Sequence, residues 1–266
     1  MDNGEIVSES IEYTRAALVG KWTNWLIFII CTLPIALIQF VADPKKIVTG
    51  GTIHWELIPW PQIIVLCIAE ILLMFIISGY LVRIYKGTTP PPAFDSWGSL
   101  FVDGIKLTIV NILWFIPAIV IFVIAFALFL LGTRAGTGSI NPMVNAGLLV
   151  ALIGLIILVI TIIYASLANV RFARTGSIRE GIRFSAITGT IQAIGWGTYI
   201  IALVIFVVLV LLFSLVISVL ALIPFVGWVI QLVLNPLISV FSARYFSRVY
   251  DHSIPQVPAP ASAPVG

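Results

Sequence analysis

One charged residue lies deep inside an apolar stretch of this sequence and is the first candidate for chemistry. Glu70 precedes Arg83 by thirteen residues, or about 20 Å along a helix at 1.5 Å per residue. An ionisable side chain inside a bilayer costs a few kcal/mol unless it is protonated or hydrogen bonded, and such residues often mark proton or ion pathways. The position predicts either such a site or a polar contact between helices, facing the helix bundle rather than lipid.

Three amides join this carboxylate as candidates for a buried polar site. Gln231 also lies thirteen residues before an arginine, and Asn235 follows it by one helical turn. Asn111 lies in another apolar stretch. We expect a hydrogen bond from Glu70 to Gln231 or Asn235 across the bundle. Polar side chains also hold membrane helices together without any further role, so both interpretations stay open.

A second pattern is a serine followed five residues later by an arginine, at the end of an apolar stretch. Its copies are Ser78 to Arg83, Ser166 to Arg171 and Ser239 to Arg244. Guanidinium groups bind phosphate in a bidentate manner, so three arginines at one depth predict a site for an anionic lipid headgroup. Arginines beside membrane spans also act as interfacial anchors, and that interpretation stays open.

Few residues could support catalysis or bind a metal. The two histidines are His54, in a connection between apolar stretches, and His252, near the C-terminus, and no His/Cys/carboxylate cluster has the spacing of metal ligands. His54 with Glu56 and Asp43 could hold a metal loosely, but we expect them to be solvated loop residues. We therefore expect no enzymatic activity, no metal and no cofactor.

Membrane helices must position these side chains. Hydrophobic residues make up 61% of the 266 residues and charged residues only 9%, whereas a soluble domain has about 25% charged residues. The 60 residues from Phe184 to Ala243 contain no Asp, Glu, Lys or Arg. Since about 20 apolar residues suffice for one crossing, this stretch predicts two crossings, with a turn near Pro224 and Gly227.

Six crossings are predicted in all, and each must be a helix because backbone polar groups in lipid have to be paired within their own segment. The predicted spans are 22–42, 62–82, 107–131, 147–170, 196–223 and 227–243. They form one transmembrane domain over residues 1–250. The Pro/Ala-rich tail over 251–266 is expected to be disordered and cytoplasmic.

Lys and Arg are distributed unequally between the two ends of these spans. One side has three of the fourteen: Lys45, Lys46 and Arg134. The other eleven are Arg15, Lys21, Arg83, Lys86, Lys106, Arg171, Arg174, Arg179, Arg183, Arg244 and Arg248. Because cytoplasmic loops carry the excess of basic residues, both termini are predicted to be cytoplasmic, in the plasma membrane. The basic side would face anionic lipid headgroups, and no nucleic acid is expected as a partner.

The spans are predicted to form three helical hairpins, each preceded by a short interfacial amphipathic helix. These lead-in segments are 5–20, 94–105 and 177–193. In the last one, Ile178, Ile182, Ile187, Ile191 and Ile194 share one face. Such helices lie along the membrane surface. Together with the three Ser-x-x-x-x-Arg endings, they favour a threefold internal repeat in an all-α integral membrane protein.

Three stretches also resemble a known family. They are Gly79-Tyr-Leu-Val-Arg-Ile84, Phe94-Asp-Ser-Trp-Gly-Ser-Leu-Phe-Val-Asp-Gly-Ile-Lys106 and Val170-Arg-Phe-Ala-Arg-Thr-Gly-Ser-Ile-Arg-Glu-Gly181. Over residues 8 to 250 the chain resembles uncharacterised archaeal multi-pass membrane proteins that share a domain of unknown function. That family is similar to the membrane domain of bacterial glycerophosphodiester phosphodiesterases. The resemblance implies no catalytic residues, and the hydrolytic barrel of those enzymes has no counterpart here.

Three functional classes are compatible with these patterns. A non-enzymatic component that transports a solute, handles lipids or belongs to a membrane complex is favoured. A purely structural bilayer protein is the alternative, and an intramembrane enzyme that acts on lipid headgroups with Glu70 as its base is less favoured. A homo-oligomer or another membrane protein is compatible as a partner with the favoured class.

Overall fold

The computed structural model of the chain describes residues 2–49, 52–134, 141–223 and 227–254. In chain order the elements are α1 (Asn3–Leu18), α2 (Trp22–Val41), α3 (Pro44–Ile47), β1 (Val48–Thr49), β2 (Thr52–Ile53), the 3-10 helix η1 (Trp55–Leu57), α4 (Trp60–Tyr85), α5 (Trp97–Arg134), α6 (Pro142–Thr175), α7 (Ile178–Gly181), α8 (Phe184–Ile194), α9 (Trp196–Ala221) and α10 (Gly227–Asp251). The described part has six helices that are long and apolar enough to cross a membrane: α2, α4, α5, α6, α9 and α10. The prediction of a helical chain with six such segments is confirmed.

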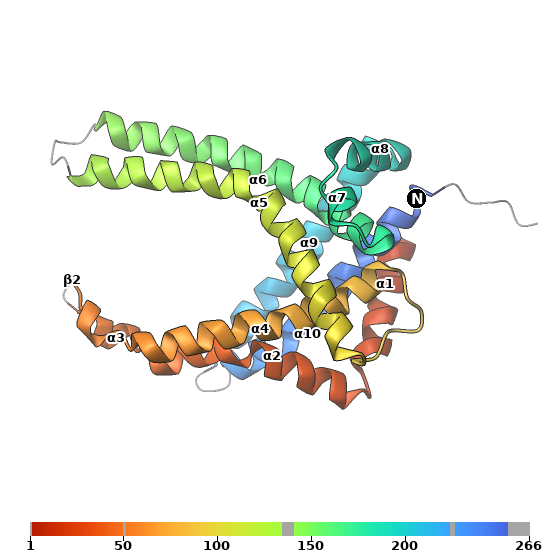
Figure 1. The fold of residues 1–266 in the computed structure, drawn as a ribbon, viewed down its shortest axis with the longest axis horizontal. Helices are drawn as coiled ribbons and strands as arrows, with labels where there is room; N and C mark the ends of the chain where they lie inside the picture. Colours follow the sequence, from red (N-terminus) through yellow and green to blue (C-terminus); the bar gives the residue numbers. More distant parts are fainter. Residues whose placement is uncertain (1, 50–51, 135–140, 224–226, 255–266) are drawn as a thin grey trace, which may run out of the picture.

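The long helices pack as neighbouring pairs that meet at one end of the molecule. In Figure 1, α2 with α4 and α5 with α6 extend to the left as two separate arms, while α1, α7 and α8 lie at the right. We call this right-hand end, which includes the C-terminal part of α10, the base. α10 packs against α9 and α1, and it also contacts α2, α4 and α6. This helix therefore connects the arms to the base.

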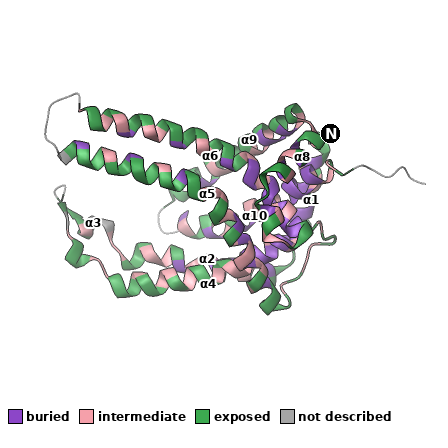
Figure 2. Cartoon of the chain, turned by 45° about the horizontal axis from the view of Figure 1, so that its top comes forward, coloured by how far each residue is buried: buried purple, intermediate pink, exposed green. Residues whose placement is uncertain are grey.

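The hydrophobic core lies in the base. Figure 2 shows that buried residues gather there, whereas the arms are exposed along most of their length. The ring of Tyr80 stacks on that of Phe94 with 4.1 Å between centroids, and Phe28 meets both rings edge-on at 5.5 Å. In the most apolar 18-residue stretch of each long helix, only 11% (α5) to 39% (α10) of the residues are buried. Most of the apolar surface of the arms therefore faces outward.

The two arms touch where α4 crosses α5. A Cβ atom added to Gly79 of α4 would collide with the backbone carbonyl of Leu100, and one added to Gly104 of α5 would collide with that of Phe75. Small residues permit this close approach between membrane helices. The two glycines therefore hold the first arm against the second.

The three predicted lead-in helices take three different forms. The first is α1. The second, over 94–105, is not a separate helix, because α5 begins at Trp97 and continues without a break to Arg134. The third is divided into α7 and α8, and Ile182 between them is 40% exposed, whereas Ile187 and Ile191 are fully buried.

Several helices also extend beyond the predicted spans. The 38 residues of α5 measure about 57 Å at 1.5 Å per residue, although the hydrocarbon core is only about 30 Å thick. α10 continues from the predicted end at Ala243 to Asp251, because the arginines that follow Ala243 are paired with carboxylates. The predicted turn at Pro224 and the tail beyond Ile254 lie outside the described residues.

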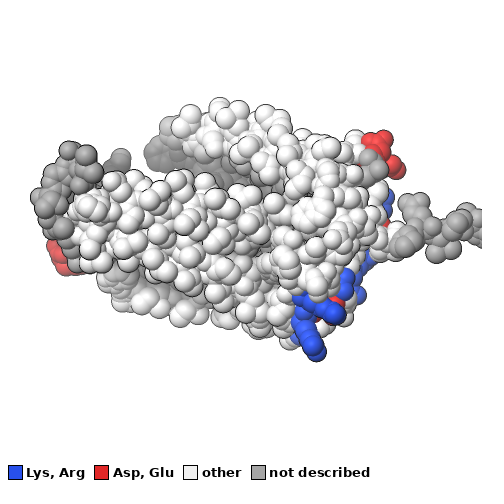
Figure 3. Space-filling view, turned by 90° about the horizontal axis from the view of Figure 1, so that it is seen from above, with Lys and Arg blue, Asp and Glu red and all other residues white. Residues whose placement is uncertain are grey.

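Charged side chains gather at the ends of the molecule. Figure 3 shows Lys and Arg at the base and a side surface without charged residues between the two ends. A surface of this kind is expected of a protein whose middle lies in lipid and whose ends reach water.

Candidate functional site

Each of the three arginines of the Ser-x-x-x-x-Arg pattern pairs with a carboxylate on a lead-in segment. The pairs, with their shortest N to O distances, are Arg83 with Asp95 (2.5 Å), Arg171 with Glu180 (2.6 Å) and Arg244 with Glu9 (2.6 Å). The order is cyclic: the first two arginines pair with the segment that follows them in the chain, and the last arginine pairs with the first segment. The base therefore contains three ion pairs that each join the end of a span to a lead-in segment.

Arg83 organises the connection between α4 and α5. Its Nη1 donates to Asp95 Oδ1 and, at 2.9 Å, to the carbonyl of Ala93. Its Nη2 donates to the carbonyl of Asp95 at 2.9 Å and to Ser99 Oγ at 3.1 Å. The guanidinium of Arg83 thus donates hydrogen bonds to four oxygen atoms at the point where the chain enters α5.

Arg171 has the same role between α6 and α7. Its Nε and Nη2 both donate to Glu180 Oε2, at 3.2 and 2.6 Å. Arg183 Nη1 donates to the other carboxylate oxygen at 3.3 Å. Chiefly because of the hydrogen bonds from Arg171, the pKa of Glu180 lies below its ordinary value. This carboxylate therefore stays charged and paired under mildly acidic conditions.

Arg244 is the most buried of the three, with 4% of its surface exposed. Its Nη2 donates to Glu9 Oε1 on α1, and its guanidinium carbon lies 4.5 Å from the ring centroid of Tyr13. The hydroxyl of Tyr13 donates to the carbonyl of Thr88 at 2.9 Å. Burial raises the pKa of Tyr13 to about 12, although the charge of Arg244 opposes the shift. This phenol therefore remains a neutral hydrogen-bond donor at physiological pH.

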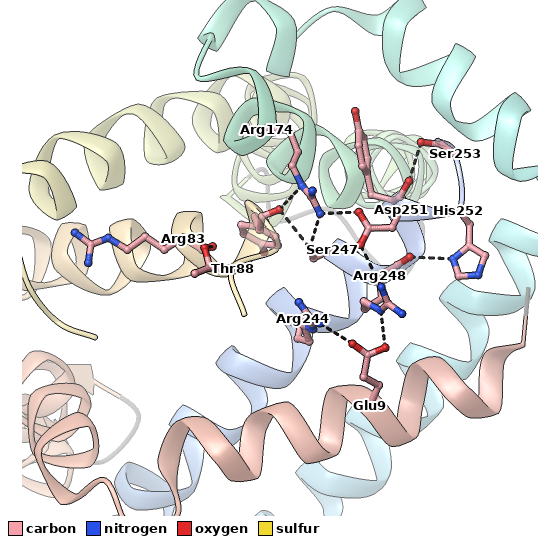
Figure 4. Close-up of polar contacts among 12 residues, drawn as sticks. Glu9, Arg83, Thr88, Arg174, Arg244, Ser247, Arg248, Asp251, His252 and Ser253 are labelled. Atoms are coloured by element: carbon pink, nitrogen blue, oxygen red, sulfur yellow. Dashed lines mark hydrogen bonds and ion pairs between the residues drawn. The ribbon is translucent and has the colours of Figure 1, made fainter. Parts of the chain in front are cut away.

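A network of charges extends from Glu9 across the base, as Figure 4 shows. Arg248 Nε lies 2.6 Å from Glu9 Oε2, and its Nη1 lies 3.6 Å from Asp251 Oδ2. Arg174 Nη2 donates to Asp251 at 2.6 Å and to Ser247 Oγ at 3.1 Å. Arg174 Nε donates to the carbonyl of Tyr85 at 2.9 Å. These contacts connect α1, α10, α6 and α4.

This arrangement bears on the predicted headgroup site at the three arginines. Every one of them is already paired with a carboxylate, so the positive charge available to a phosphate is reduced. Figure 4 also shows Arg83 directed away from Arg244. The contacts found are those of a structural clamp between lead-in segments and spans.

Glu70 has a different partner from the one predicted. Its Oε2 accepts a hydrogen bond from the backbone N–H of Ile35 on α2, at 3.2 Å. Pro34 precedes this residue within α2, and a proline disturbs the hydrogen bonds of its helical turn. A neighbouring helix can satisfy backbone groups that a proline leaves without partners. Glu70 therefore joins α4 to α2 at the proline site.

The amides named with Glu70 are not gathered around it. Gln231 and Asn235 are exposed, and in the described chain no hydrogen bond joins either of them to Glu70. Asn111 of α5 accepts a hydrogen bond from Asn169 Nδ2 of α6 at 3.1 Å. Asn111 therefore belongs to a separate contact between α5 and α6, and these side chains do not form one polar pathway among the described residues.

The loop residues that were considered as metal ligands form pairs with residues close to them in the sequence. His54 Nδ1 lies 3.0 Å from Glu56 Oε1, and Lys46 Nζ lies 3.8 Å from Asp43 Oδ2. Hydrogen bonds to its own backbone N–H and to His54 lower the pKa of Glu56. Within residues 2–49, 52–134, 141–223 and 227–254, no three metal-binding side chains form a cluster.

Sequence reasoning missed the carboxylates that complete the base. Asp95 follows Arg83 by 12 residues and Glu180 follows Arg171 by 9. Every lead-in segment contains an acidic residue, and this shared feature is the signal that could have suggested such pairs. The first segment has three acids and the second has two, so the sequence does not single out the partner. Arg174 gave no comparable signal, because its partners lie 73 to 89 residues away in the chain.

Two substitutions of Glu70 separate a structural role from ionisation. Glu70→Gln keeps an oxygen that can accept from the Ile35 N–H and should leave stability nearly unchanged. Glu70→Leu removes the acceptor of the Ile35 N–H and should lower the free energy of unfolding by about 1–3 kcal/mol. Thermal unfolding in detergent measures both variants, with Ile71→Ala at an exposed neighbouring position as the control.

The same variants address ion or proton transport. If Glu70→Gln folds normally but abolishes a cellular phenotype that Ile71→Ala preserves, ionisation of Glu70 is required and the purely structural role is contradicted.

Comparison with known proteins identifies one family. No curated protein and no solved structure matches the chain. The model of a family described as a protein of unknown function, DUF4013, matches residues 63–222. This range contains two of the three ion pairs of the base and covers more than half of the chain. The chain therefore belongs to the DUF4013 family of proteins of unknown function.

Proposed function

We propose that the protein is a non-enzymatic, lipid-handling component of the membrane, whose arms contact lipid and whose base holds them together. The observation that carries this proposal is the contrast in burial between the arms and the base. In the most apolar 18-residue stretch of each of five helices, at most 22% of the residues are buried. These helices are α2, α4, α5, α6 and α9. Apolar surface of this extent needs an apolar environment, which lipid or another membrane protein supplies.

The polar contacts support lipid handling over solute transport and intramembrane catalysis. Glu70 satisfies a backbone N–H, and Asn111 binds a neighbouring amide. A transport route would need polar groups that face a common path. A headgroup-cleaving enzyme would need a base placed beside a nucleophile or a bound metal. The described residues offer a structural explanation for each of these groups.

The proposed architecture has three repeated units, each made of a lead-in segment, two spans as a hairpin and a terminal arginine. The cyclic pairing of the arginines supports it, because each unit then makes an equivalent contact with another. We further propose that α1 and α8 lie at the membrane interface. The relation to archaeal proteins and to the membrane domain of glycerophosphodiester phosphodiesterases likewise remains a proposal.

The base is proposed to face the cytoplasm of a cell whose plasma membrane the protein spans. A cysteine that replaces Thr133, at the far end of α5, should react with an impermeant reagent added to intact cells. A cysteine that replaces Ser253 should react only after permeabilisation. Both variants are made in a chain without Cys31 and Cys67, and the reverse pattern would contradict the orientation.

Lipid dependence tests the proposed function. Delipidated protein in detergent is expected to unfold at a higher temperature when phospholipid is added back, because a ligand that binds only the folded state stabilises it. An equal amount of additional detergent serves as the control. An unfolding temperature that responds equally to both additions would contradict lipid handling and favour a protein partner for the arms.

A further inference from the structure

A groove runs between α1 and the helix pair formed by α9 and α10. Its floor and walls are apolar side chains of α9 and α10, among them Val210, Phe213, Leu237 and Phe241, and its volume is about 320 Å³. Volumes from about 300 Å³ are typical of small-molecule sites. The groove is open to the surface of the molecule, and because α9 and α10 are long and apolar enough to cross a membrane, we expect the opening to face the bilayer.

The end of the groove near the base carries a cation. Arg15, in the last turn of α1, lines the groove together with Thr14. Leu237 lies seven residues before Arg244, so the groove extends about 10 Å from the level of the base into the membrane. A ligand in this groove would thus have its apolar part in the bilayer and its polar part beside Arg15.

Arg15 differs from most arginines of the base in having no carboxylate partner, and among the described residues it shares this property with Arg179. The paired arginines are Arg83, Arg171, Arg174, Arg183, Arg244 and Arg248. In the described part of the chain Arg15 forms no ion pair, not even with Glu12 one turn earlier, and its side chain is exposed. A negative charge at this point would complement it.

We propose that this groove binds one anionic phospholipid of the leaflet next to the base. An acyl chain would lie against the apolar side chains of α9 and α10, and the phosphate would pair with the guanidinium of Arg15. The proposal rests on the proposed lipid-handling function and names the lipid class and the site. Arg15 attracts the charged headgroup, and the apolar walls take the chain.

Native mass spectrometry of the full chain measures this binding. The protein is released from vesicles that contain equal amounts of phosphatidylglycerol and phosphatidylcholine. One retained phosphatidylglycerol is expected, with a preference of about fivefold over phosphatidylcholine, the attraction of one basic residue for an anionic lipid. Arg15→Gln should abolish the preference. Arg179→Gln removes another exposed cation without an ion pair and should keep it.

A second variant tests the groove itself. Val210→Phe fills part of the apolar wall and should reduce the retention of both lipids severalfold, without a change in the oligomeric state of the protein. An undiminished preference in Arg15→Gln, or full retention in Val210→Phe, would overturn the site. A change of oligomeric state in Val210→Phe would assign the groove to a second copy of the chain instead.

The two proposals fail in distinguishable ways. If the wild-type protein retains phospholipid without any headgroup preference, the anionic site is wrong and lipid handling stands. If no variant, including the wild type, retains phospholipid and added lipid does not raise the unfolding temperature, both proposals are wrong.

Discussion

Glu9→Leu is expected to lower the free energy of unfolding by about 3 kcal/mol, the lower end of the cost of removing one partner from a buried ion pair. Glu9 is the carboxylate partner of Arg244 and also lies 2.6 Å from Arg248 Nε. Arg244 is 4% exposed, whereas the side chain of Glu9 is 32% exposed, so water that enters on the side of Glu9 replaces only part of the lost interaction. Urea unfolding of the protein in detergent, followed by helical circular dichroism, measures the loss.

Glu12→Leu is the matched control for this substitution. Glu12 lies on the same helix, is exposed and has no ion pair among the described residues. Its removal should change the free energy of unfolding by less than about 0.5 kcal/mol. In the Glu9→Leu background, Arg244→Met should recover part of the loss, because the unpaired buried charge is removed. Equal effects of Glu9→Leu and Glu12→Leu would show that the ion pairs of Glu9 do not stabilise the base.

Gly79→Leu is expected to be the most disruptive single substitution in the arms. Its side chain would meet the backbone of Leu100, which cannot move aside as a flexible side chain can. Overpacking costs about 1–3 kcal/mol, and a collision with backbone should reach the upper end of that range. Gly104→Leu should act in the same way, because its Cβ would meet the Phe75 carbonyl. Thermal unfolding and the yield of monodisperse protein measure both variants.

Gly98→Ala on α5 is the control for the crossing. A Cβ atom at Gly98 meets no atom within 4 Å, so this change should be neutral or slightly stabilising, since alanine restricts the unfolded chain more than glycine does. If Gly79→Leu and Gly104→Leu are as well tolerated as Gly98→Ala, α4 and α5 do not cross in backbone contact.

The number of membrane-crossing helices could be predicted because an apolar stretch of sufficient length needs an apolar solvent, whatever its partners in the fold. An uncharged run such as residues 184–243 has to be accommodated in lipid, and its length limits the number of crossings. The ends of the helices depend on partners that composition does not show. Arg244 looks like the end of a span in the sequence, but its charge is neutralised by Glu9 and the helix continues to Asp251.

The polar site was harder to predict than the spans. The depth of Glu70 follows from counting residues, but its partner is a backbone N–H beside Pro34, and side-chain patterns contain no information about such a donor. The repeated arginines were visible as a motif, whereas the acids Glu9, Asp95 and Glu180 do not share one local sequence. Which acid pairs with each arginine becomes clear only from the contacts in the base.

Contact between the arms and lipid is the central claim, and footprinting of the protein in nanodiscs tests it most directly. One sample is labelled by a photoactivated carbene dissolved in the lipid, and the other by hydroxyl radicals generated in water. Exposed residues of α5 and α6, such as Phe126 and Ile156, which are both 62% exposed, should take up the carbene and no hydroxyl label. Hydroxyl labelling of these residues would indicate water along the arms, and the absence of both labels would indicate a protein partner, so either result would contradict the account.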